Sequence, residues 1–347
     1  MNIIRAGYEI MPEQSSFLKK IELVARTCYK SEDLITEDSC VKMVDNLIQR
    51  EHYAMLEHAT LVLNMDGESF YDTLDLMNHI EKSLKLRNDY KTFKGYLNFT
   101  DYNAYYIISG NIRGWIEFLQ ECVEATGKIP LFFKKFLEQN KTQDNLVLFK
   151  EFYNSNGGYF GKDPEDPWCC QIKDTSKLSI EERLIHEILT VKFTVDRGVT
   201  HELVRHRDCS FAQESTRYCN YSKGKFGNEL TVIEPCFFVK DTNVYTRKYG
   251  IWKAGCESCE QAYFELLEAG ATPQEARDVL PTSVKADIIM TTNIREWIHI
   301  LELRALGVTG KPHPQMEEVM VPLAKELATG KLSKFTCIES VNNMLSL

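Results

Sequence analysis

Cationic and hydroxyl side chains gather between residues 205 and 218, and their types suit the binding of an anion. Residues 205–207 read Arg-His-Arg, and residues 215–218 read Ser-Thr-Arg-Tyr. A guanidinium is planar and permanently charged, and it binds phosphates and carboxylates through paired hydrogen bonds. Guanidiniums this close in the chain repel one another unless an anion lies among them. The segment therefore predicts a phosphate-binding site for a small anionic ligand.

The chain lacks the glycine-rich motifs that commonly bind nucleotides. Neither GxGxxG nor GxxxxGK[ST] occurs, so a nucleotide must be held by side chains and not by a glycine-rich turn. Ser215 could act as a nucleophile or as a phosphate ligand. No GxSxG elbow surrounds it. A serine between cations is better placed to donate a hydrogen bond to an anion, so we favour the ligand role.

The composition is that of a globular protein and argues against nucleic acid as the main partner. The chain has 347 residues, of which 44% are hydrophobic and 26% charged, and its net charge is -9. Disorder is not expected at this apolar content. Proteins that bind duplex nucleic acid usually have a broad basic face, which this acidic composition does not favour. No stretch has the length of a membrane span, and the first residues lack the apolar core of a signal peptide. We expect a cytoplasmic protein that binds neither nucleic acid nor membrane.

The cysteines and histidines do not form a metal motif. The 11 cysteines are expected to be reduced thiols. Cys256 and Cys259 form a lone CxxC, which could be a redox pair or half a zinc site, but we favour small apolar fillers of a helix. Residues 201–206 superficially suggest HExxH, but Arg205 stands where the second histidine is needed. We therefore expect no metal.

Apolar periodicity predicts the elements that position these groups. Helices are expected at residues 13–30, 37–51, 70–87, 112–126, 129–139, 200–207, 252–269 and 293–305, with a further one from Thr272 that ends before Pro281. Strands are expected at 60–63 and 191–195, and a loop at 208–222. The composition changes between residues 66 and 188, so we interpret this part as an insertion, with a polar stretch at 154–168.

The helix expected at residues 293–305 has an apolar stripe with a polar edge on each side. The stripe consists of Ile294, Trp297, Ile298, Leu301 and Ala305, with Asn293 and Arg304 at one edge and Arg295, His299 and Glu302 at the other. Such edges suit a solvated face or a helix that borders a site. Residues 111–119 resemble residues 293–301, which indicates a duplicated helix with structural polar residues but no repeat architecture.

Several separate blocks together resemble one known family. The pattern Arg205-His206-Arg207-x7-Ser215, extended by Arg217-Tyr218, resembles the signature of the flavin-dependent thymidylate synthases. Residues 25–29, 52–58, 277–281, 293–297 and 303–304 resemble further blocks of that family in the same order. The resemblance covers about residues 1–65 and 189–335. It implies one α+β domain over residues 1–347, with a central, mostly antiparallel sheet flanked by helices and a largely helical insertion of unassigned role at about 66–188.

The resemblance also implies an activity. The family converts dUMP to dTMP, with methylenetetrahydrofolate as carbon donor and with FAD that is reduced by NADPH. It works as a homotetramer whose active sites are shared between subunits. Two alternatives stay open for this chain. It could be a flavin- and folate-dependent uracil methylase that acts on another substrate, or a non-catalytic nucleotide-binding protein.

Matching the family's motifs assigns roles to individual residues. The dUMP ligands would be Glu202, Arg205, Gln213, Glu214, Ser215, Arg217, Arg277 and Arg304. The FAD contacts would be Arg205, His206, Arg207, Glu57, Asn293, Arg295 and His299. Arg304, facing the uracil ring, and His52, near the flavin, would be catalytic. A fixed guanidinium stabilises negative charge on a pyrimidine and so promotes reaction at its C5 carbon.

The chain departs from the family pattern in three places. Many relatives have Asn-Glu where this chain has Ala212-Gln213, and the acid is displaced here to Glu214. Either Gln213 or Glu214 would then replace the usual acid. Many relatives have Gln at the position of Glu202, and a carboxylate there would repel a phosphate unless an arginine pairs with it or it turns toward the base. Some relatives have Thr at the position of Ala54.

Overall fold

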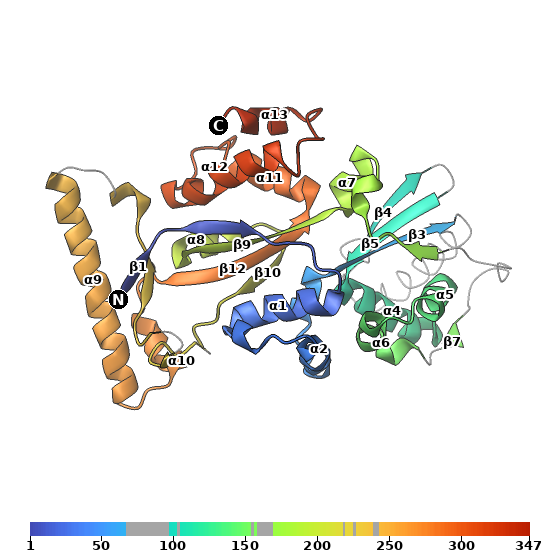
Figure 1. The fold of residues 1–347 in the computed structure, drawn as a ribbon, viewed down its shortest axis with the longest axis horizontal. Coiled ribbons are helices and arrows are strands. Elements are labelled where there is room, and N and C mark those ends of the chain that lie inside the picture. Colours follow the sequence, from blue (N-terminus) through green and yellow to red (C-terminus); the bar gives the residue numbers. More distant parts are fainter. Residues whose placement is uncertain are drawn as a thin grey trace. The chain divides into compact units, whose positions relative to one another are not determined.

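The chain folds into two compact units, each of which is described by itself. The computed structural model describes residues 1–66, 97–102, 105–153, 156–157, 169–217, 219–224, 227–238 and 243–347. Unit 1 comprises Met1–Pro12, Val24–Asp33 and Leu189–Leu347, and unit 2 comprises Glu13–Leu23 and Leu34–Ile188. Both combine helices with antiparallel strands, which confirms the α+β class (Figure 1). The predicted single domain with an insertion at 66–188 stays a prediction.

Unit 1 is built around a four-stranded sheet with the order β10-β12-β9-β2. Its strands are β2 (Gly7–Ile10), β9 (Ile188–Asp196), β10 (Ser210–Gln213) and β12 (Lys285–Asn293). The interior residues of β12 are buried without alternation, because both faces of the strand are covered. A smaller parallel pair joins β1 (Asn2–Ile4) to β11 (Thr231–Ile233).

The helices of unit 1 follow its strands in the chain. They are α8 (Arg197–Leu203), α9 (Asn243–Glu268), α10 (Pro273–Ala276), α11 (Ile294–Arg304), α12 (Pro314–Thr329) and α13 (Glu339–Leu345). The last three pack together over one face of the sheet (Figure 1). Helix α11 begins where the side chain of Asn293 accepts a hydrogen bond from the backbone N–H of Glu296 at 2.9 Å. Its apolar stripe is buried, as expected.

Unit 2 has its own four-stranded sheet, with the order β4-β5-β3-β8. The strands are β3 (Thr60–Asp66), β4 (Leu97–Tyr102), β5 (Tyr105–Asn111) and β8 (Cys169–Gln171), and a short pair joins β6 (Lys128–Ile129) to β7 (Asn156–Gly157). The helices are α2 (Ser39–Gln49), α4 (Ile112–Thr126), α5 (Leu131–Gln139), α6 (Gln143–Leu148) and α7 (Ile180–His186). Helix α1 (Phe17–Tyr29) contributes residues to both units.

The resemblance between residues 111–119 and 293–301 extends to the structure. In each case a strand ends at an asparagine whose side chain caps the next helix. Trp115 and Trp297 are both fully buried. The indole of Trp115 donates to the carbonyl of Leu61 at 3.2 Å, and that of Trp297 to the carbonyl of Leu189 at 2.9 Å. The matching asparagines and tryptophans therefore have a structural role.

Most of the expected elements that lie in the described residues are confirmed. The helices at 13–30, 37–51, 112–126, 129–139 and 293–305 and the strands at 60–63 and 191–195 are present. Thr272 starts α10 as a capping box with Glu275. The helix expected at 70–87 and most of the polar stretch at 154–168 lie outside the described residues. Within the described part, no helix is long and apolar enough to cross a membrane.

Three expectations around the arginine cluster and α9 were wrong. The helix expected at 200–207 is α8, which begins at Arg197 because the side chain of Asp196 accepts from the backbone N–H of Val199. The expected loop at 208–222 contains β10, which is too short for alternation to reveal and which depends on pairing with β12 far along the chain. Helix α9 begins at Asn243 and not at 252, because residues 246–251 are mostly exposed and leave no apolar face to signal a helix.

Candidate functional site

A pocket in unit 1 collects the cationic residues that the sequence analysis singled out. It has a volume of about 600 Å³ and is lined by Arg205, His206, Arg207, Asp208, Glu296, His299, Leu303 and Arg304. Strand pairing brings these two segments together. In the antiparallel β10–β12 pair, Ser210 lies opposite Thr291, so the start of β10 adjoins the end of β12. The turn that precedes β10 therefore meets the helix that follows β12.

The turn that carries the arginines is held in place by its backbone. Helix α8 ends at Leu203, and Asp208 has a φ of 42°, a left-handed conformation that a helix cannot continue through. Thr292 of β12 donates its hydroxyl hydrogen to the carbonyl of Asp208 at 2.7 Å. The turn exposes Arg205 and Arg207 to solvent. No ion pair of either guanidinium occurs within the described part of the chain.

Arg304 lies at the centre of the hydrogen bonds in this pocket. Its Nε donates to Nε2 of His206 at 3.1 Å, and its Nη1 donates to Oε2 of Glu202 at 3.2 Å. The carboxylate that replaces the family's usual glutamine is therefore paired with an arginine. This pairing removes the repulsion that an unpaired Glu202 would exert on an anionic ligand.

His206 is neutral in this environment. Burial, and then the positive charge of Arg304, lower its pKa to about 4. Because Nε2 accepts a hydrogen bond from Arg304, the ring proton of the neutral imidazole lies on Nδ1. His206 can thus orient Arg304 through one nitrogen and donate a hydrogen bond to a ligand through the other.

Helix α11 contributes three polar residues and Leu303 to the wall of the pocket. The sequence analysis placed Arg304 and His299 at opposite edges of the apolar stripe, yet both line the same pocket together with Glu296. Nδ1 of His299 lies 3.7 Å from Oε2 of Glu302. Arg295 is exposed and is not among the lining residues, and Asn293 caps the helix. Their predicted contacts with FAD stay predictions.

Glu202 also borders a second, more apolar pocket of unit 1. This pocket has a volume of about 340 Å³, and its aromatic walls are Phe237, Phe238 and Trp252. The aromatic rings suit a planar ligand, and Glu202 joins this pocket to Arg304. Sequence analysis did not find these aromatic residues, because nothing in their spacing relates them to the arginine motif.

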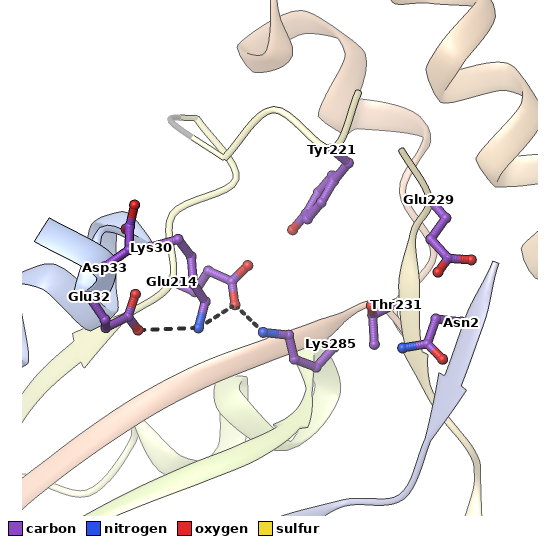
Figure 2. A pocket seen from close by; sticks show the side chains of 9 residues that line it. All are labelled: Asn2, Lys30, Glu32, Asp33, Glu214, Tyr221, Glu229, Thr231 and Lys285. Atoms are coloured by element: carbon purple, nitrogen blue, oxygen red, sulfur yellow. Dashed lines mark hydrogen bonds and ion pairs between the residues drawn. The ribbon is translucent and has the colours of Figure 1, made fainter. Parts of the chain in front are cut away.

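Gln213 and Glu214, the two candidates for the family's acid, have different environments. Gln213 lies at the end of β10, and its Nε2 donates to the hydroxyl of Thr200 on α8 at 3.1 Å. Glu214 is buried with 2% of its side chain exposed, and its Oε2 accepts a hydrogen bond from Lys285 at 2.7 Å (Figure 2). Glu214 therefore belongs to a buried charge network, and Gln213 contacts the helix that leads to Arg205.

The remaining predicted dUMP ligands do not line the pocket around Arg304. The backbone N–H of Ser215 donates to the carbonyl of Cys28 at 3.2 Å, and Arg217 is exposed. Arg277 begins the turn after α10, with 40% of its side chain exposed. Tyr218 lies outside the described residues. Within one chain, these groups and Arg304 are thus separate parts of the predicted site.

His52 and Glu57 belong to unit 2. His52 precedes the short helix Tyr53–His58. Oε1 of Glu57 accepts a hydrogen bond from Nη1 of Arg113 at 2.8 Å, and Arg113 also pairs with Glu117 at 2.7 Å. Their predicted roles beside FAD stay predictions. Over the ranges that the structure describes, no group of His, Cys, Asp and Glu side chains could hold a metal ion.

Comparison with known proteins points to one family. Residues 172–329 match the family model described as "Thymidylate synthase complementing protein". The flavin-dependent thymidylate synthase of Thermococcus onnurineus is 35% identical over 128 residues, which cover 36% of this chain and 49% of that protein. The enzymes of the same name from Pyrococcus abyssi and Geobacter sulfurreducens are each 31% identical, over 42% and 32% of this chain and 57% and 44% of their own lengths.

The chain thus spans about half the length of the curated relatives that it matches. The matched segment contains the Arg205–Arg207 turn, the predicted dUMP ligands from Glu202 to Arg277, and Arg304 on α11. Residues 172–329 of this chain are thus similar to the thymidylate synthase complementing protein family.

Proposed function

We propose that the protein is a flavin-dependent thymidylate synthase that methylates dUMP to dTMP. Methylenetetrahydrofolate would be the carbon donor, FAD the cofactor and NADPH the reductant. One observation carries the proposal. Arg205, Arg207 and Arg304 border one pocket with a neutral His206, and all four lie in residues 172–329, which match the thymidylate synthase complementing protein model.

The pocket around Arg304 fits an anionic flavin nucleotide in charge and in hydrogen bonding. The exposed guanidiniums of Arg205 and Arg207 can bind phosphate oxygens in paired hydrogen bonds. Nδ1 of His206 can donate one more. When bound, the flavin supplies the redox chemistry of the reaction, and the protein supplies binding and orientation.

The chain's own catalytic contribution is electrostatic. Arg304 is held by His206 and Glu202 before any ligand arrives, so little reorganisation is needed when negative charge develops on a pyrimidine. Glu202 compensates part of the charge of Arg304 and fixes its direction. The aromatic pocket beyond Glu202 offers planar surfaces for a ring. This arrangement supports the predicted role of Arg304 facing the uracil.

Ser215, Arg217 and Arg277 would bind the phosphate of dUMP. Since they do not line the pocket around Arg304, we propose that a second subunit completes each site, as expected for a homotetramer with shared active sites. The expected cytoplasmic location stays part of this proposal. No role is assigned to residues 66–188.

The test is a direct assay of the purified protein. We expect a flavin absorption spectrum that dUMP perturbs, and dTMP formation that requires methylenetetrahydrofolate and NADPH. Methylation of uridine in RNA without methylation of free dUMP would favour the alternative of a uracil methylase that acts on another substrate. A colourless protein that binds dUMP without turnover, even after FAD is added, would favour the non-catalytic alternative.

A further inference from the structure

A third pocket of unit 1 shares no lining residue with the pocket around Arg304. It has a volume of about 510 Å³. Its walls come from separate segments, among them Asn2 on β1, Lys30 after α1, Glu214 after β10, Thr231 on β11 and Lys285 on β12 (Figure 2). Among its lining residues only Glu214 is a predicted dUMP ligand, and the proposed reaction gives no role to the others.

The floor of this third pocket contains a buried carboxylate with one free oxygen. Glu214 is 2% exposed, and its Oε2 is engaged by Lys285 at 2.7 Å and by the backbone N–H of Asp287 at 3.3 Å. Its Oε1 is buried and has no hydrogen-bond partner among the described residues. In Figure 2 this oxygen points into the pocket. A buried carboxylate oxygen is costly to leave unpaired, so a ligand that donates a hydrogen bond is expected there.

The two lysines of this pocket are already neutralised by carboxylates. Lys285 lies 2.7 Å from Glu214 and 3.1 Å from Asp287, and Lys30 forms an ion pair with Asp287. Burial alone would lower the pKa of Lys30, but Glu214 and Asp287 raise it above its usual value. Burial would raise the pKa of Asp287, but Lys285 and Lys30 lower it. The lysines therefore do not make this an anion site.

The rim of the pocket has an excess of negative charge. The ammonium group of Met1 lies 3.2 Å from Glu229 and compensates the charge of its carboxylate. Glu32 reaches Lys30 only at 3.8 Å, and Asp33 is exposed with no ion pair within the described part. Glu32 is thus only weakly compensated and Asp33 is not paired within the described part, and these carboxylates attract cations and repel nucleotide phosphates.

We infer that this pocket binds a linear diammonium ligand of the polyamine class. One ammonium group donates to Oε1 of Glu214, and the other pairs with Glu32 and Asp33 at the rim. The hydroxyl of Tyr221 also points toward the pocket (Figure 2). An ammonium group donates a hydrogen bond to the unpaired oxygen and also compensates the negative charge of the rim. A neutral donor such as water can supply only the hydrogen bond.

The experiment is calorimetric titration of the purified protein with putrescine and spermidine at low ionic strength. Butane-1,4-diol, which has the same carbon chain without charge, is the matched ligand control. We expect saturable binding of the diamines that weakens as salt is added, and none of the diol. Absence of diamine binding, or equal binding of the diol, would overturn the inference.

Variants locate the binding in this pocket. Glu214→Gln is expected to weaken diamine binding about tenfold or more, since it removes the buried charge. Glu265→Gln, on the exposed surface of α9, is the control and should bind as the parent protein does. If Glu214→Gln does not fold, the exposed rim variant Asp33→Asn decides, with an expected loss of about threefold or more. Unchanged affinity in the folded variants would refute the inference. The readout needs neither dUMP nor turnover, so it is independent of the proposed function.

Discussion

Arg304 of α11 donates a hydrogen bond to Glu202 of α8 at 3.2 Å, although the two residues lie 102 positions apart in the chain. A glutamine at this position, as the resemblance implies for many relatives, could accept the same hydrogen bond without carrying charge. The carboxylate partly compensates the positive charge of Arg304. In the proposed reaction, Glu202 would weaken the electrostatic effect of Arg304 on the pyrimidine, but it would also hold the guanidinium firmly in place.

Arg304→Ala should abolish dTMP formation and leave FAD bound, because Arg205 and Arg207 remain in the pocket. Glu202→Gln should retain turnover, since the amide oxygen can still hold Arg304. The measurements are dTMP production and the flavin spectrum. Arg247→Ala, which removes an exposed guanidinium from α9, is the control. Normal turnover in Arg304→Ala would remove this residue from the mechanism.

Arg217→Ala should mainly weaken dUMP binding. If Arg217 binds the phosphate, its loss removes a charge-assisted contact and should cost about 2 kcal/mol or more of binding free energy. The KM for dUMP should rise much more than kcat falls. Titration with dUMP, followed by the flavin spectrum, measures the affinity. Unaltered affinity would show that Arg217 lies outside the dUMP site.

Local sequence signals predicted α11 well. Asn293 as cap, the buried stripe and Arg304 in the last turn could all be read from spacing, because a helix is specified by residues close in the chain. The residues around Arg304 were predicted from the blocks that resemble the family. These blocks are far apart in the chain, and the β10–β12 pairing brings them together. Strand β10 was missed, because its pairing with β12 is long-range and leaves no periodic pattern.

The buried charge network was also missed, although one signal was present. Lys285 and Asp287 are two positions apart at the start of β12, so they lie on the same face of the strand. Their partners Lys30 and Glu214 come from distant segments. No pattern within a short window links these four residues. The same holds for the aromatic pocket beside Glu202.

Lys285→Met should destabilise the protein by about 3 kcal/mol, because it leaves Glu214 and Asp287 with incomplete charge compensation in a buried position. Urea unfolding measures the change. Lys253→Met is the matched control, since its partner Glu257 and the lysine are both about half exposed, and it should cost less than about 1 kcal/mol. Adding Glu214→Gln to Lys285→Met should restore part of the loss. A loss no larger than the control's would show that the network contributes little.

His186 should make the protein less stable in acid. Burial lowers its pKa to about 4, and its ring nitrogens are hydrogen-bonded to Thr100 and Ser109 at 2.8 and 2.7 Å. In the unfolded chain a histidine titrates near pH 6.5. Between about pH 6.5 and pH 4 the unfolded state therefore binds more protons than the folded state, and stability falls as the pH falls.

The variant His186→Gln isolates this contribution. Glutamine can hydrogen-bond to the same hydroxyl groups but does not titrate. Unfolding free energies measured from about pH 7 down to about pH 4.5 should fall less steeply in the variant than in the parent protein. The difference between the two curves removes the effect of other groups that titrate in this range, His206 among them. Parallel curves would mean that His186 is protonated in the folded state as readily as in the unfolded one.

The two matched tryptophans should respond alike to the same substitution. Trp115→Phe and Trp297→Phe each remove the N–H that donates to a buried strand carbonyl, of Leu61 in one unit and of Leu189 in the other. Each should cost about 1–3 kcal/mol in urea unfolding. Trp252→Phe is the control, because its partner is a partly buried side-chain hydroxyl, so its cost should be smaller. If only one of the two buried tryptophans matters, the structural correspondence between residues 111–119 and 293–301 does not extend to energetics.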